Sequence, residues 1–223
     1  MKIKKFQQGE GRRLCLLLNG WSAPPELFAD WAVPADADFW VAYDYRDLIF
    51  PEPLQAFEEV HLVAWSLGVW VATALWGEQA NFASAIAING TPFPIHAEWG
   101  IPPAVFEGTL QHLDADGQRR FERRMCGDRV TLQRYQQLSA RLIEERAEEL
   151  QALYAAIQAM PIDESVAASF WDKALVCTDD RIFTAGNQLA YWNGKATVEE
   201  ITASHVLFYQ PRFQQELQPN LWK

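Results

Sequence analysis

Short apolar runs closed by turn residues are the clearest pattern in this chain of 223 residues. Such runs, partly β-branched and four to six residues long, are typical of buried strands, and segments of helical character separate the early ones. The alternation predicts an α/β fold with a mostly parallel sheet and helices on both faces. The predicted strands are residues 14–18, 39–43, 60–65, 85–88 and 174–178, and residues 197–201 are a candidate sixth strand.

The interval 93–160 interrupts this alternation. Proline-rich turns open it, and a helical stretch rich in Arg, Glu, Gln and Leu follows, with one apolar face formed by Ile143, Ala147, Leu150, Leu153, Tyr154 and Ile157. We expect a helical lid inserted into a core made of residues 1–92 and 161–223. Such a lid would lie over the carboxyl ends of the strands, where open α/β sheets bind ligands.

Composition narrows the class of protein. The chain of 223 residues is long enough for one domain with a sizeable core, and 49% of its residues are hydrophobic. No apolar stretch approaches the roughly 20 residues of a membrane helix, and residues 1–6 do not begin a signal peptide, so a cytoplasmic monomer that binds no membrane is expected. The three cysteines are odd in number and widely spaced, which favours reduced core residues, without a metal or cofactor. A net charge of −10 argues against a nucleic-acid partner.

Ser66 is the candidate nucleophile, in the segment Ala64-Trp65-Ser66-Leu67-Gly68. A nucleophile elbow places a serine in a strained strand-to-helix turn, with small residues two before and two after it, as here. Ala64 stands where the motif usually has glycine, but an apolar strand precedes Ser66 and a helix-forming segment follows. The alternative is a buried serine in an ordinary turn.

Chain order then selects a base and an acid. In the α/β-hydrolase fold the acid and the histidine follow the serine, the acid after a late strand. Of the four histidines, His205 alone lies after strand 174–178; the others are His61, His96 and His112. Asp179 and Asp180 both follow that strand, and Asp180 is preferred because Asp180-Arg181-Ile182-Phe183 resembles the turn after the acid in many such hydrolases. The two aspartates could be reversed.

An oxyanion hole requires two backbone donors, one after the nucleophile and one from the loop after an early strand. The Leu67 N–H is the first candidate, and the Trp21 N–H, in Asn19-Gly20-Trp21, is the second. Trp21 is also a candidate wall of the acyl pocket, together with Phe93, Phe106 and Phe121.

With these motifs the chain resembles the pimeloyl-acyl-carrier-protein methyl ester esterases of biotin synthesis, in the short form typified by BioG. The resemblance covers most of the chain and includes Ile88 to Pro94, Phe106 to Leu110, Phe121 to Met125, and Asp180 to Phe183 with Asn187-Gln188. Thr184 and Cys177 depart from the usual pattern around the acid. The resemblance implies hydrolysis of a carrier-bound methyl ester through an acyl-enzyme on Ser66.

An arginine-rich segment favours an acidic carrier protein as the partner. Eight arginines and four carboxylates give residues 119–146 a charge of +4, so the rest of the chain carries −14. Arginine forks near the site could hold an acidic protein and its phosphopantetheine phosphate. The candidates are Arg119, Arg120, Arg123 and Arg124, and the alternative is a solvated helix face.

Two other functions remain open from the sequence. The first is a general short-chain carboxylesterase or thioesterase without a carrier partner, because the same three residues serve all acyl transfers. The second is a hydrolase-fold binding module without turnover. The complete set of serine, acid and histidine in the required order argues against the second.

Overall fold

A twisted sheet forms the centre of the computed structural model, which describes residues 1–9, 11–79, 81–138 and 141–222. Within these residues the sheet has seven strands in the order β1-β3-β2-β4-β5-β6-β7. Strands β2 to β7 are parallel, and β1 pairs antiparallel with β3 at one edge. The strands are β1 (Lys2–Gln7), β2 (Arg13–Leu18), β3 (Ala37–Tyr43), β4 (Glu59–Trp65), β5 (Ser84–Ile88), β6 (Lys173–Cys177) and β7 (Thr197–Ile201).

All five predicted strands and the candidate sixth are present, and the apolar runs explain why. The central strands β2 and β4 are buried almost throughout, as expected for parallel strands covered on both faces. The apolar pattern does not predict β1, because its lysines are exposed and Ile3 and Phe6, its two apolar residues, are only half-buried. Charged edge strands of this kind protect a sheet from pairing with other chains.

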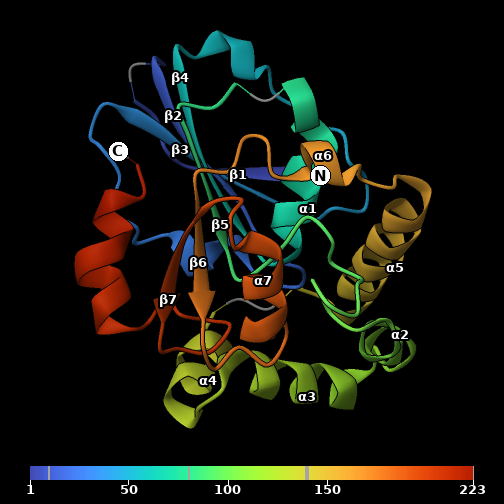
Figure 1. The fold of residues 1–223 in the computed structure, drawn as a ribbon. Helices are drawn as coiled ribbons and strands as arrows, with labels where there is room; N and C mark the ends of the chain where they lie inside the picture. Colours follow the sequence, from blue (N-terminus) through green and yellow to red (C-terminus); the bar gives the residue numbers. More distant parts are fainter. Residues whose placement is uncertain (10, 80, 139–140, 223) are drawn as a thin grey trace.

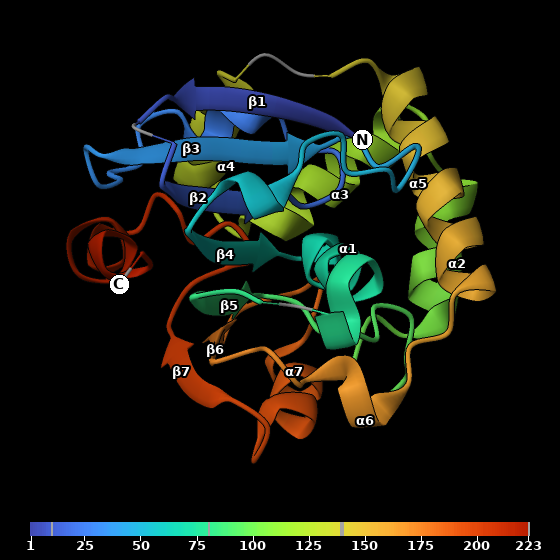
Figure 2. The same ribbon diagram turned by 90° about the horizontal axis from the view of Figure 1, so that it is seen from above.

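Helices cover both faces of the sheet. Helices α1 and α5 lie on one side, and the C-terminal turns Phe213–Leu217 and Gln218–Asn220 lie on the other (Figure 1). Figure 2, from above, shows the same division. The helices are α1 (Leu67–Trp76), α2 (Pro103–Gln111), α3 (Ala115–Cys126), α4 (Arg129–Gln136), α5 (Ile143–Ala159), α6 (Glu164–Ala167) and α7 (Ala185–Trp192).

The interval 93–160, expected to form a lid, contains α2 to α5. The side chains of Asp114 and Asp128 accept backbone N–H groups at the starts of α3 and α4, which fixes where these helices begin. Figure 1 shows α3 and α4 beyond the ends of β6 and β7. The assignment of residues 93–160 as a separate lid stays a prediction.

Helix α5 differs from its predicted pattern in one respect. Leu150 and Leu153 of the expected apolar face are buried, but so are Arg146 and Glu149. Their charges are paired inside the protein, Arg146 with Glu122 at 3.2 Å and Glu149 with Arg141 at 2.6 Å. Arg141 and Arg146, two arginines of the arginine-rich segment 119–146, are therefore internal and unavailable to a partner.

Candidate active site

Ser66 occupies a sharp turn between β4 and α1. Its backbone has φ 58° and ψ −126°, a conformation that a non-glycine residue adopts only under strain. The turn requires close approach of the chain around it: a Cβ on Gly68 would lie 2.5 Å from the Leu18 carbonyl oxygen, and one on Gly90 would lie 2.3 Å from the Ser66 carbonyl oxygen. The geometry is that of the predicted nucleophile elbow.

Asp180 and His205 form a buried pair at the same edge of the sheet. Asp180 follows β6, His205 follows β7, and their side chains are 0% and 1% exposed. His205 Nδ1 lies 2.7 Å from Asp180 Oδ2. Because a carboxylate oxygen can only accept here, Nδ1 carries the proton and Nε2 is left as an acceptor. Ser66 and His205 line one pocket.

Backbone donors explain why Asp180, and not Asp179, faces the histidine. The second oxygen of Asp180, Oδ1, accepts the N–H groups of Ile182 at 2.7 Å and Phe183 at 3.1 Å. Gln188 Nε2 donates to Oδ2 at 3.2 Å. Asp179 is exposed to solvent. The turn after β6 thus holds one carboxylate inward and leaves its neighbour outside.

The His205 main chain is fixed by two side chains that the sequence did not single out for a role. Trp65 Nε1 donates to the His205 carbonyl oxygen at 3.2 Å, and Asn89 Nδ2 donates to the same oxygen at 2.9 Å. Asn89 Oδ1 in turn accepts the Cys177 N–H at 2.9 Å. Asn89 therefore links the ends of β5 and β6 to the loop that carries His205.

The same loop is also tied to α3. Ser204 Oγ donates to the Cys126 carbonyl at 2.7 Å, and the Val206 N–H donates to the Met125 carbonyl at 3.2 Å. Gly127 ends α3 at φ 76°, where a Cβ would lie 2.6 Å from the Ser204 Cβ. Residues on both sides of His205 thus dock on the last turn of α3.

The loop after β2 contains Trp21, whose N–H is the predicted second donor of the oxyanion hole. In the described parts of the chain, neither the Trp21 N–H nor the Leu67 N–H has a hydrogen-bond partner. Asn19 shapes this loop, because its Oδ1 accepts the Gly20 N–H and its Nδ2 donates to the Ala23 carbonyl, each at 2.8 Å. Both N–H groups are available for an oxyanion.

Glu149 of α5 stabilises this loop by accepting hydrogen bonds from its backbone and from that of Tyr45. Its carboxylate accepts the Ser22 N–H at 3.4 Å and the Tyr45 N–H at 2.8 Å, and Trp21 Nε1 donates to the Arg146 carbonyl at 2.8 Å. Burial raises the pKa of Glu149, while the charge of Arg141 and the Tyr45 N–H oppose that rise. The sequence alone does not reveal this role, since a glutamate in an Arg/Glu-rich helix is usually solvated.

The pocket above Ser66 is largely apolar. Trp21, Phe106 and Phe121 line it as expected, and the Trp21 and Phe121 rings meet edge to face with centroids 4.8 Å apart. The expectation for Phe93 is wrong: its ring is not part of the lining and packs on Trp99 and Tyr191, with centroids 5.3 and 5.5 Å away. The proline-rich turn carries Phe93 into the core beside α7.

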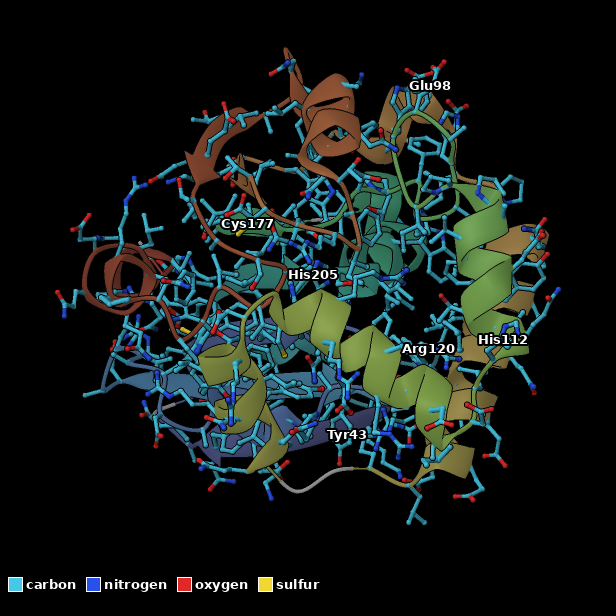
Figure 3. The ribbon with its side chains drawn as sticks, turned by 90° about the horizontal axis from the view of Figure 1, so that it is seen from below. Tyr43, Glu98, His112, Arg120, Cys177 and His205 are labelled. Atoms are coloured by element: carbon cyan, nitrogen blue, oxygen red, sulfur yellow. The ribbon has the colours of Figure 1, made fainter. Side chains whose placement is uncertain are left out.

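The four candidate arginines of α3 have different surroundings. Arg119, Arg120 and Arg123 are exposed, and Arg119 forms an ion pair with Asp116. Arg124 is half-buried and lines the pocket that contains Ser66. In Figure 3 Arg120 lies toward α2 and His112, whereas His205 lies beside the other end of α3.

Other reactive side chains stand outside this arrangement. The three cysteines are free and buried, and burial raises the pKa of the Cys177 thiol to about 12, so this neighbour of the acid is protonated near neutral pH. In the described ranges no group of His, Cys, Asp and Glu side chains could hold a metal ion. Across the same ranges, no helix combines the length and apolar character needed to cross a bilayer.

Comparison with known structures identifies the fold. The naproxen esterase of Bacillus subtilis aligns with a TM-score of 0.61 at 15% identity, covering 95% of this chain and 83% of that one. This likeness shows the fold alone, and it confirms the predicted α/β-hydrolase architecture.

Much stronger similarity exists to one family. The crystal structure of BioG from Haemophilus influenzae aligns with a TM-score of 0.90 at 39% identity over 100% of both chains. An uncharacterized protein of H. influenzae is 40% identical over 204 residues, which are 92% of this chain and 93% of the relative. A malonyl-[acyl-carrier protein] O-methyltransferase of Bacteroides fragilis is 38% identical over 180 residues, which are 79% of this chain and 36% of that protein.

A family match decides the classification. Residues 1–216 match the family described as "Pimeloyl-ACP methyl esterase BioG". The match spans the elbow at Ser66, the Asp180–His205 pair and the helices between β5 and β6. The resemblance found in the sequence is thus confirmed, and the chain belongs to the BioG family of pimeloyl-ACP methyl esterases.

Proposed function

We propose that this chain is a serine carboxylesterase that removes the methyl ester from a pimeloyl chain carried by an acyl carrier protein, as a step of biotin synthesis. The observation that carries the proposal is the buried pair of His205 Nδ1 and Asp180 Oδ2, 2.7 Å apart, in the pocket that also contains Ser66. Membership in the BioG family supports the substrate.

In the first half of the reaction Ser66 attacks the ester carbonyl. His205 Nε2 takes the serine proton, and Asp180 stabilises the imidazolium that forms. The N–H groups of Leu67 and Trp21 stabilise the oxyanion, and the N-terminus of α1 adds its partial positive charge. The imidazolium then protonates the leaving methoxide, so methanol departs and a pimeloyl ester of Ser66 remains.

Water completes the cycle. His205 Nε2 accepts a proton from water as its oxygen attacks the acyl-enzyme, and the same two N–H groups hold the second oxyanion. Collapse of this intermediate returns the proton to Ser66 Oγ and releases a free carboxylate at the end of the chain. The apolar lining formed by Trp21, Phe106 and Phe121 suits the methylenes of that chain.

Charge on α3 supports an acidic carrier protein as the partner. Arg120 and Arg123 are exposed, and no carboxylate in the described parts of the chain forms an ion pair with either one. The relative from B. fragilis is named for methyl transfer to malonyl-acyl-carrier protein, the reaction that would create such an ester. An enzyme that removes the ester is a chemical counterpart of that activity.

The carrier is tested by comparing two substrates. Replacing Arg120 and Arg123 by Ala should lower kcat/KM for methyl pimeloyl-carrier protein by roughly tenfold at low salt, and less at high salt, because these charges guide association. Hydrolysis of p-nitrophenyl butyrate gives the reference rate. A matched control replaces Arg12 and Arg212, exposed arginines that pair with Glu58 and Glu199. Equal effects of the two double variants on the carrier substrate would refute docking on α3.

The nucleophile is tested separately. A fluorophosphonate probe should label the wild-type chain on the peptide that contains Ser66, and Ser66→Ala should abolish labelling while the protein stays folded by circular dichroism. Labelling of the Ala variant at the wild-type rate would refute Ser66 as nucleophile. A folded wild-type protein that does not react would favour a binding module.

A further inference from the structure

Arg124 differs in its surroundings from the other arginines of α3. It is half-buried, and its Nε is buried without a hydrogen-bond partner in the described parts of the protein. Burial lowers the pKa of its guanidinium, and the charge of Asp180 only partly offsets this effect. A guanidinium that loses water without gaining an acceptor is unfavourable, so an acceptor supplied by a ligand would remove that penalty.

Within the described residues Arg124 forms no hydrogen bond and no ion pair. The nearby carboxylate of Asp180 is already occupied by His205, by the N–H groups of Ile182 and Phe183, and by Gln188. Among the described residues that line the pocket, only Arg124 and His205 have a basic side chain. The guanidinium is therefore a free donor facing mostly apolar walls.

Arg124 stands where two cavities meet. One is the pocket that contains Ser66, and the other is a groove between α2 and α3 that includes Arg120 and His112. The two share Thr109, Phe121 and Arg124. Figure 3 shows the groove side of α3, with Arg120 directed toward α2. A chain that is bound at Ser66 and extends from the pocket into the groove would pass Arg124, because Arg124 lines both cavities.

We infer that Arg124 is a specificity-determining residue that binds a carbonyl oxygen at the far end of the acyl chain. The preferred ligands are thus esters whose acyl chain ends in a second carbonyl group, and plain fatty acyl esters of equal length are disfavoured. In a carrier-bound substrate this oxygen is that of the thioester. The inference rests on the proposed hydrolysis of esters at Ser66, but not on docking of a carrier.

Two small esters with seven-carbon acyl chains isolate this contact. Dimethyl pimelate has a far carbonyl group, whereas methyl heptanoate ends in a methyl group. In Arg124→Met, which keeps an unbranched apolar stem but removes the guanidinium and its donors, the ratio of kcat/KM for dimethyl pimelate to that for methyl heptanoate should fall roughly 10- to 100-fold, as expected for loss of a hydrogen bond from a charged donor. Arg124→Lys should keep part of the preference.

A control variant on α4 shows whether the effect is specific to Arg124. Arg129→Met removes a charge from an exposed site at the start of α4 and should leave the ratio unchanged. Because both rates are measured on one preparation, partial unfolding cancels from the ratio. An unchanged ratio in Arg124→Met would overturn the role of Arg124 and leave the esterase intact. Failure of the wild-type protein to hydrolyse either ester would overturn the proposed function and this inference together.

Discussion

Replacing Glu149 by Gln tests how far α5 supports the candidate active site. The carboxylate has 0% exposure, pairs with Arg141 at 2.6 Å, and accepts the backbone N–H groups of Tyr45 and Ser22. Gln keeps one acceptor oxygen but turns an NH2 group toward another donor, and it removes the charge that faces Arg141. The variant therefore leaves a buried donor unsatisfied and breaks a buried ion pair.

The magnitude follows from these contacts. An unsatisfied buried donor costs about 1–3 kcal/mol, and loss of one partner of a buried ion pair costs about 3–5 kcal/mol. Two features reduce the sum: Arg141 keeps Asp44 at 3.3 Å, and burial already disfavours the charged form of Glu149. We expect the free energy of unfolding to fall by about 3 kcal/mol, which lowers Tm by roughly 6–12 °C in a chain of this size.

The assay combines stability with turnover. Tm is measured by circular dichroism, and kcat is measured for p-nitrophenyl butyrate well below Tm. Because Ser22 adjoins Trp21, displacement of the loop should lower kcat about tenfold with little change in KM. Glu148→Gln is the control, since its exposed pair with Arg46 should be worth less than about 1 kcal/mol. Equal Tm shifts for the two variants would refute the reasoning.

Three further substitutions have defined outcomes. Asp180→Asn should lower kcat about 10⁴-fold, because it favours the wrong His205 tautomer; a loss under tenfold in steady-state assays would exclude Asp180 as the acid. Burial opposes ionisation of Asp44, but Arg46, Lys2 and Arg141 lower its pKa, so its stabilising effect is present near neutral pH and is lost as pH falls below about 4. The Tm difference between wild type and Asp44→Asn should therefore shrink from pH 7 to pH 3, and a constant difference would contradict this. Gly68→Ala should lower the free energy of unfolding by about 2–4 kcal/mol, as its Cβ would lie 2.5 Å from a carbonyl oxygen, whereas in Gly186→Ala, where the space is open, denaturant titration should show no loss.

Local signals were sufficient for the sheet and for most of the site geometry. Most residues of the buried strands are apolar, and parallel strands bring their carboxyl ends to one edge, so chain order indicates that Ser66 and His205 lie near each other, and both line one pocket. The choice between Asp179 and Asp180 depended on the turn after β6. The resemblance of this turn to those of other hydrolases favoured Asp180, whose carboxylate accepts the N–H groups of Ile182 and Phe183 in the structure.

Contacts between distant parts of the chain could not be predicted in the same way. Glu149 and Arg146 have the spacing of a solvated Arg/Glu helix, and only their partners far away in sequence make them internal. Asn89 lay in a recognised motif, but the two hydrogen bonds of its side chain reach segments more than 80 residues away, at Cys177 and His205. The prediction that Phe93 lines the pocket was wrong for a related reason. Its ring is directed toward Tyr191 by a turn, and a turn has no apolar periodicity from which this direction could be predicted.

The hydrogen bonds between the His205 loop and the last turn of α3 have a consequence for engineering and for evolution. Ser204 and Val206 donate to the carbonyl groups of Cys126 and Met125, so helix α3 is part of the framework that orients the imidazole. A chimera with another hydrolase's cap would have to offer two carbonyls at the same positions, or the histidine loop would lose its alignment. The outward surface of α3 can diversify toward new partners, while its C-terminal turn is constrained to change together with the residues around His205.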